Sequence, residues 1–197
     1  MGRDFRIGID FDNTIAGYDR VFAAVARESG WLNGAGPLSK RAVRKTVRAL
    51  PDGETKWQML QAQVYGARMA DAVVLSGACE FLDRCVKIGI QVFVISHKTQ
   101  FATFDPQRID LRQAARDWMR TQGLDVPAYF EPTRSAKIAR IAALGCTHFV
   151  DDLEEVFTDP SFPEGVARIL LSTDPVDVDA GIRVLESWHD IAQAIFA

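Results

Sequence analysis

Hydrophobic residues alternate with polar or small ones where the chain begins, and they form continuous runs further along. Phe5, Ile7 and Ile9 alternate up to Asp10, a period of two that predicts a β-strand. Residues 90–95 form an apolar run, Ile-Gln-Val-Phe-Val-Ile, which is typical of a strand buried on both faces of a parallel sheet. Shorter apolar segments predict three more strands, at residues 128–130, 147–150 and 168–171.

Segments with helical spacing lie between these strands. The pattern predicts helices at about residues 77–87, 111–122, 135–144 and 188–196. Strands that alternate with helices favour a parallel sheet covered on both faces. We therefore predict an α/β fold with a doubly wound parallel sheet.

One block interrupts this alternation. From about Gly17 to Ala70 the chain lacks strand signals, and helical patterns over 38–50 and 56–69 are separated by Pro51-Asp52-Gly53. We interpret residues 17–70 as a small, mainly helical insertion above the carboxyl edge of the sheet. Residues 1–16 and 71–197 then form the core domain.

Composition and charge narrow the classes of function. The chain has 197 residues, of which 48% are hydrophobic, and a formal net charge of -3, so it can bury a sizeable core. No basic excess favours a nucleic-acid partner, whereas a small anionic substrate held through a metal is compatible with this charge. No apolar run approaches the roughly 20 residues that cross a bilayer, so we expect no membrane partner and a soluble cytoplasmic protein. The three cysteines, an odd number without C-x-x-C spacing, favour reduced residues in the core.

Polar residues gather where the predicted strands end. In doubly wound sheets ligands bind outside the carboxyl ends of the strands, so these residues are the candidates for chemistry. They are Asp10 and Asp12 after the first strand, Ser96, His97, Lys98 and Thr99 after the second, Asp151 and Asp152 after the strand at 147–150, and Lys137 near the start of the helix before it.

Carboxylates that converge on one edge repel one another unless they share a hard divalent cation. Mg²⁺ suits an all-oxygen set of ligands and also binds phosphate oxygens. Asp10 could then act as a nucleophile that forms an aspartyl-phosphate, while Asp12 protonates the leaving oxygen and later activates water. Ser96 and Lys137 offer a hydroxyl and an ammonium to the phosphoryl oxygens.

These residues form an ordered set of four motifs. Asp10-Phe11-Asp12-Asn13-Thr14 is a D-x-D-x-T sequence, Val94-Ile95-Ser96 is an apolar strand that ends in Ser, Lys137 is a Lys at a helix start, and Phe149-Val150-Asp151-Asp152 ends in paired acids. In this order and at these places the motifs resemble those of the haloacid dehalogenase-like (HAD) superfamily. The block 17–70 is similar in placement to the family's cap, which is inserted after the first motif.

The resemblance implies a role for each motif. Asp10 is implied to be nucleophile and metal ligand, and Asp12 to be acid and base with its backbone carbonyl on the metal. Asp152 is favoured for direct contact with Mg²⁺ and Asp151 for a water-mediated one. Because dehalogenase members lack the second acid of the first motif, Asp12 argues for phosphoryl transfer.

Other residues have both a functional and a structural interpretation. Thr14, His97, Lys98 and Arg134 are candidate substrate contacts, although loops at strand ends need polar residues in any case. Ser96 and Lys137 could likewise be a turn residue and a surface residue. Four basic residues of the insertion share one helical face and could bind a distal anionic group or simply be solvated: Arg41, Arg44, Lys45 and Arg48.

The sequence thus predicts a Mg²⁺-dependent phosphatase that hydrolyses a small phosphorylated metabolite, such as a sugar phosphate or nucleotide. Two alternatives stay open. One is a phosphotransferase or mutase of the same superfamily, and the other is a non-catalytic module that binds a phosphorylated ligand. The oligomeric state is also open, with a homodimer as one option.

Overall fold

The computed structural model describes residues 5–34 and 39–197. The first four residues of the predicted core domain lie outside the described residues, as does Leu38 at the start of a predicted helix. The described chain forms two compact units. The first comprises residues 1–16, 74–98 and 124–197 without the undescribed start, and the second comprises residues 17–73, without 35–38, and 99–123.

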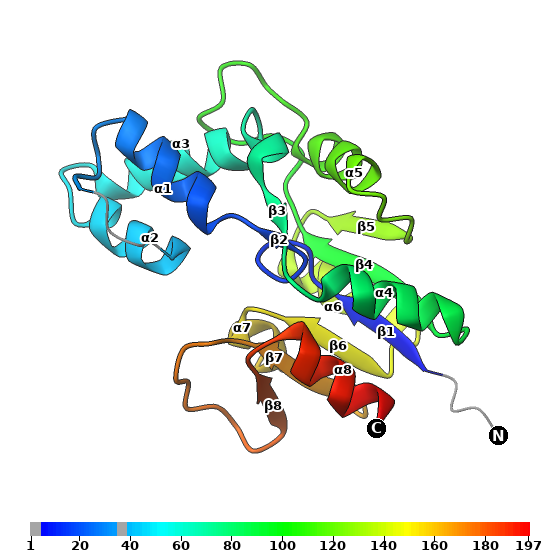
Figure 1. Cartoon of the computed structure of the whole chain (residues 1–197). Helices are drawn as coiled ribbons and strands as arrows, with labels where there is room; N and C mark the ends of the chain where they lie inside the picture. The colour runs from blue at the N-terminus through cyan, green and yellow to red at the C-terminus, as the bar shows by residue number, and fades with distance from the viewer. Residues whose placement is uncertain (1–4, 35–38) are drawn as a thin grey trace. The chain divides into compact units, whose positions relative to one another are not determined.

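A six-stranded sheet forms the centre of the first unit (Figure 1). Its strands are β1 (Arg6–Ile9), β4 (Gln91–His97), β5 (Ala128–Glu131), β6 (His148–Asp151), β7 (Ala167–Leu171) and β8 (Ile182–Leu185). They lie in the order β5-β4-β1-β6-β7-β8, and every neighbouring pair is parallel. The structure therefore confirms the predicted parallel α/β fold and all five predicted strands of the sheet, and it adds β8.

The strand order places the end of β1 at a switch point. After β1 the chain builds β4 and β5 on one side, and it then returns to build β6, β7 and β8 on the other. Crevices outside the carboxyl ends of strands form where the order reverses in this way. Asp10, the residue directly after β1, occupies this point.

Close packing around β1 depends on a glycine. A Cβ atom at Gly8 would lie 2.6 Å from Cδ2 of Phe149 on the neighbouring strand β6. Only glycine leaves room for that aromatic ring, which is fully buried. Gly8 thus lets the large ring of Phe149 pack against β1, the strand that ends directly before Asp10.

Helices cover both faces of the sheet. Figure 1 shows α4 (Ala78–Lys87) and α8 (Trp188–Phe196) in front, and α6 (Arg134–Ala143) and α7 (Glu154–Phe157) behind. The core under α6 and α7 contains Ile95, Ile138, Ile141, Phe149, Phe157 and Leu170. On the other side the indole N–H of Trp188 donates to the Thr14 carbonyl oxygen at 2.8 Å, which ties α8 to the loop after β1.

The second unit is helical. It contains α1 (Asp19–Glu28), α2 (Lys40–Arg48), α3 (Gly53–Tyr65), the 3-10 helix η1 (Met69–Asp71) and α5 (Leu111–Thr121). Phe22 stacks on Trp57 with ring centroids 5.0 Å apart, and both are buried. Trp57 is therefore part of the aromatic core of this unit.

Three elements depart from the expected pattern. The short strands β2 (Ala16–Gly17) and β3 (Val73–Val74) pair where the chain leaves the first unit and where it returns. Helix α5, which follows β4 in the sequence, belongs to the second unit. The extent of an insertion at 17–70 stays a prediction.

The three cysteines are free thiols. Cys85 and Cys146 are buried free thiols, and burial raises the pKa of Cys85 to about 12 and that of Cys146 to about 11. Cys79 is a half-buried free thiol.

Among the described helices, none combines the length and the apolar character that crossing a bilayer requires.

Candidate active site

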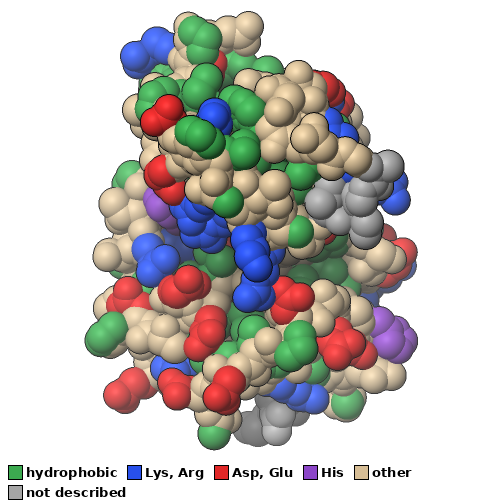
Figure 2. All heavy atoms as spheres, turned by 90° about the vertical axis from the view of Figure 1, so that its left-hand side faces the viewer, with side chains coloured by type: hydrophobic (Ala, Val, Ile, Leu, Met, Phe, Trp, Pro, Cys, Tyr) green, Lys and Arg blue, Asp and Glu red, His purple; other side chains and the backbone are tan. Residues whose placement is uncertain are grey.

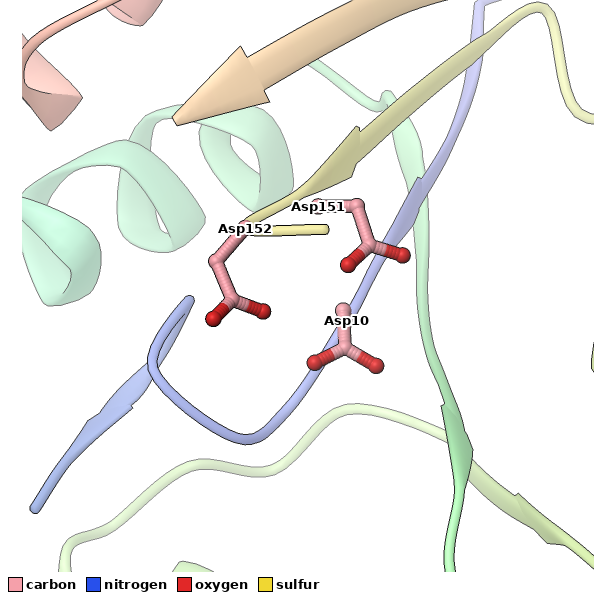
Figure 3. A group of neighbouring side chains, drawn as sticks. All are labelled: Asp10, Asp151 and Asp152. Atoms are coloured by element: carbon pink, nitrogen blue, oxygen red, sulfur yellow. The ribbon is translucent and has the colours of Figure 1, made fainter. Parts of the chain in front are cut away.

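Three carboxylates converge at the carboxyl edge of the sheet. Asp10 follows β1, Asp151 ends β6, and Asp152 comes directly after it (Figure 3). One oxygen of each can be chosen so that all three lie within 4.8 Å of one another. The Asp10 N–H donates to the Val150 carbonyl oxygen at 2.8 Å, so the parallel pairing of β1 and β6 extends to the site itself.

A buried lysine binds two of these carboxylates. The Lys137 ammonium lies 2.6 Å from Oδ1 of Asp10 and 2.6 Å from Oδ2 of Asp151. Burial alone would lower the pKa of Lys137, but the charges and hydrogen bonds of Asp10 and Asp151 raise it above its usual value. Lys137 is therefore a permanent cation inside the site.

Asp151 is the most enclosed of the three acids. Its Oδ2 accepts from Lys137, and its Oδ1 accepts from the Leu153 N–H at 3.0 Å. Burial raises the pKa of Asp151, the Lys137 charge opposes that rise, and the Asp10 charge adds to it. Burial is the largest of these causes, and together with the Asp10 charge it outweighs the opposing charge of Lys137.

The loop after β1 folds back on itself directly behind Asp10. The Ile15 and Ala16 N–H groups both donate to the Phe11 carbonyl oxygen at 3.0 Å. The Asn13 N–H donates to the Ala16 carbonyl oxygen at 2.8 Å. Asn13 has a φ of 59°, in the left-handed region that Asn tolerates better than most residues. Its side-chain amide donates to Oδ2 of Asp152 at 3.3 Å. Asn13 is not among the candidate residues predicted from the sequence, and its place inside the D-x-D-x-T motif was the available signal.

Lys98 contacts Asp12. Its ammonium lies 2.8 Å from Oδ2 and 3.1 Å from Oδ1 of that residue, and the Lys98 side chain is only 3% exposed. The same ammonium lies 5.6 Å from the centroid of the Phe11 ring. The structure thus brings together two residues that the sequence placed at the ends of two different strands.

The other candidate residues lie around this centre. Ser96 is buried in β4, one residue before the exposed His97. Partial burial of the imidazole, together with the charges of Lys137 and Arg134, lowers the pKa of His97. Arg134 is exposed in the first turn of α6. Thr14 is fully buried, and its hydroxyl has no hydrogen-bond partner among the described residues.

The basic residues of α2 carry no assigned role. Figure 2 shows Lys and Arg side chains, in blue, at the surface on the side from which it views the chain. Arg41, Arg44 and Lys45 are exposed, whereas Arg48 pairs with Glu54 at 2.7 Å and lies over the Trp57 ring. This helix belongs to the second unit, so whether it meets a substrate stays a prediction.

The charges of the site are unequal. The site holds four carboxyl groups, those of Asp10, Asp12, Asp151 and Asp152, and two ammonium groups, those of Lys98 and Lys137. The carboxyl groups outnumber the ammonium groups by two, an excess that a divalent cation would offset. An oxygen-only donor set with this excess fits Mg²⁺ better than a softer metal.

Comparisons with known proteins agree on the fold. No family model matches the chain, and a search of curated proteins finds no match either. Among solved structures, a HAD-superfamily hydrolase from Ehrlichia chaffeensis aligns over 100% of this chain and 98% of its own, with 15% identity and a TM-score of 0.57. A predicted phosphoglycolate phosphatase from Haemophilus somnus aligns over 98% and 99%, with 12% identity and a TM-score of 0.56.

A third structure adds another class of activity. Protein tyrosine kinase A of Mycobacterium tuberculosis aligns over 100% of both chains, with 14% identity and a TM-score of 0.62. At identities this low the likenesses establish the architecture of the chain, and the chemistry has to be argued from the site.

Proposed function

We propose that this chain, which has the haloacid dehalogenase-like fold, is a Mg²⁺-dependent phosphatase that hydrolyses a small phosphomonoester through an aspartyl-phosphate on Asp10. The observation that carries the proposal is the convergence of Asp10, Asp151 and Asp152 around the buried ammonium of Lys137. The structure from Haemophilus somnus is described as a predicted phosphoglycolate phosphatase, an enzyme of the same reaction class, phosphomonoester hydrolysis.

Asp10 is the nucleophile in this proposal. One of its oxygens attacks phosphorus, the bond from phosphorus to the leaving oxygen breaks, and that oxygen takes the electron pair and a proton from Asp12. Lys137 pairs with Asp10 and fixes the direction of its carboxylate through the 2.6 Å contact to Oδ1. Lys137 also places a positive charge where negative charge gathers on the phosphoryl oxygens.

Asp10 and Asp152 would hold the metal directly. Both oxygens of Asp151 already accept hydrogen bonds from Lys137 and Leu153, so a water-mediated contact suits this residue better. The Asp12 backbone carbonyl is the further ligand that the family resemblance implies. A bound Mg²⁺ supplies charge neutralisation and orientation of the phosphoryl group.

The Asp152→Asn variant should bind Mg²⁺ more weakly without losing its fold. Removing one charged ligand from a cation site with few ligands should raise the Kd by roughly 10- to 100-fold, by analogy with the loss of supporting ligand contacts. Isothermal titration calorimetry with MgCl₂ measures this directly. Asp174→Asn, in a segment outside the acid cluster, is the matched control. An unchanged Kd for Asp152→Asn would remove Asp152 from the proposed ligand set.

The activity itself is tested on the purified protein. We expect phosphate release from p-nitrophenyl phosphate and from a panel of phosphorylated metabolites in Mg²⁺, and loss of that release in EDTA. Release that persists at full rate in EDTA would overturn the metal dependence. The metabolite with the highest kcat/KM identifies the substrate class, which the residues around the phosphoryl group do not decide.

Transfer to an acceptor other than water is the second candidate function. The likeness to a protein described as a tyrosine kinase, over the full length of both chains, is the observation that favours it. Product analysis separates the two candidates, because a transferase yields more phosphorylated acceptor than free phosphate.

A further inference from the structure

The Lys98 side chain is placed unusually for a residue in a loop after a strand. It is 3% exposed, and a buried ammonium is costly unless it has a partner. Its partner is Asp12, whose two oxygens lie 2.8 and 3.1 Å away. An ammonium that contacts both oxygens restricts the rotation of the carboxylate more than a single contact would.

The position of Lys98 is itself set by the sheet. Its backbone N–H donates to the Glu131 carbonyl oxygen at 2.9 Å, which continues the pairing of β4 with β5. The Glu131 side chain is held in turn by Arg140 at 2.8 Å. Phe11, over which the Lys98 ammonium lies, packs edge-on against Phe130 with centroids 5.6 Å apart. Rigid strands therefore determine where the ammonium sits.

The two lysines of the site serve different carboxylates. Lys137 contacts Asp10 and Asp151, and Lys98 contacts Asp12. The Lys98 ammonium is enclosed against Asp12 and Phe11 and is therefore poorly exposed for contact with a substrate. Lys98, which the sequence suggested as a substrate contact, thus has Asp12 as a partner within the chain.

We propose that Lys98 is a positioning residue that holds the Asp12 carboxylate in place to activate water against the aspartyl-phosphate. This inference rests on the proposed phosphatase function. In that step a water oxygen attacks phosphorus, the bond between phosphorus and the Asp10 oxygen breaks, and its electron pair returns to Asp10. The proton of the water passes to Asp12, which is needed there as a carboxylate.

Removal of Lys98 should then slow one half of the reaction selectively. With p-nitrophenyl phosphate, whose leaving group departs readily, Lys98→Met should still form the aspartyl-phosphate in a rapid burst of nitrophenol. Hydrolysis of that intermediate should slow by roughly 10- to 100-fold, the usual cost of misplacing a catalytic group. The fraction of phosphorylated enzyme at steady state should rise.

Stopped-flow absorbance measures the burst, and mass spectrometry of acid-quenched enzyme measures the phosphorylated fraction. Lys87→Met, an exposed lysine at the end of α4, is the control for the loss of a charge. A raised KM with a slower burst in Lys98→Met would mean that Lys98 binds substrate, and equal slowing of both phases would mean a merely structural role. Either result overturns the proposal.

A double-mutant cycle provides a second test that does not depend on one variant alone. If Lys98 acts through Asp12, adding Lys98→Met to Asp12→Asn should change the hydrolysis rate by less than about twofold. Full additivity of the two effects would contradict the proposal. Failure of the phosphatase function itself is distinguishable, because the wild-type protein would then release neither nitrophenol nor phosphate.

Discussion

The Asp10→Asn variant is expected to lose at least about 10³-fold in kcat, because loss of a nucleophile removes the covalent route and leaves only binding and electrostatic stabilisation. An amide of the same shape is a poor nucleophile and cannot form a stable acyl-phosphate. Asn can still accept a hydrogen bond from Lys137, which remains paired with Asp151. The variant should therefore fold, and phosphate release is the measurement that separates it from the wild type.

The matched control for this variant is Asp125→Asn. Asp125 is an exposed carboxylate of the same unit, so its loss changes the net charge equally without touching the site. We expect this control to retain wild-type activity. Activity of Asp10→Asn within tenfold of the wild type would exclude Asp10 as the nucleophile.

The Lys137→Met variant should lose about 3–5 kcal/mol of unfolding free energy in EDTA, because removal of one partner of a buried ion pair leaves its charges uncompensated. Asp10 and Asp151 are both buried and both contact this ammonium, so neither can turn to solvent instead. Urea denaturation measures the loss. Lys87→Met, which removes an exposed lysine, should change the same quantity by less than about 0.5 kcal/mol.

The loss should also depend on pH with a definite sign. Without Lys137 the pKa of Asp151, already raised by burial in the wild-type protein, should rise further in the folded state. A carboxyl with a raised folded-state pKa takes up a proton in the folded state before it does so in the unfolded state. The destabilisation relative to the wild type should therefore shrink as the pH falls from the folded-state pKa of the variant toward that of the wild-type protein. A deficit that grows as the pH is lowered across that range would contradict the assigned charges.

Mg²⁺ should also restore part of the stability that Lys137→Met loses, because a cation bound by Asp10 and Asp152 offsets the same uncompensated charge. The variant should nevertheless stay catalytically impaired, since in the proposed reaction Lys137 also stabilises the charge on the phosphoryl oxygens. A variant with wild-type kcat would remove Lys137 from the catalytic machinery.

The fold could be predicted because its signals are local. The apolar run at 90–95 and the alternation before Asp10 are properties of short segments, and both segments form strands of the sheet. The meeting of Asp10 with Asp151 followed from the rule that carboxyl ends of parallel strands share one edge. β8 was missed because its four residues, Ile-Arg-Val-Leu, are too short and mixed to stand out after a polar loop.

The contacts inside the site were harder to predict because they join residues that are far apart in the sequence and meet only in the folded chain. The sequence does not distinguish the contacts of Lys98 from those of Lys137, and only the distances in the folded chain show which carboxylate each ammonium contacts. Asn13 reaches Asp152 because a backbone turn with positive φ aims its side chain across the edge of the sheet. The grouping of α5 with the helices of the second unit likewise reflects packing that no local pattern of residues 111–121 encodes.

The most direct test of the central claim is to trap the intermediate. Wild-type protein mixed with p-nitrophenyl phosphate and Mg²⁺, quenched in acid within milliseconds and digested, should yield a peptide that carries one phosphoryl group on Asp10. The group should be released by hydroxylamine, as an acyl-phosphate is, and it should be absent from Asp10→Asn. Turnover with no phosphorylated Asp10 peptide, in wild-type protein or in the slowly hydrolysing Lys98→Met variant, would contradict the account.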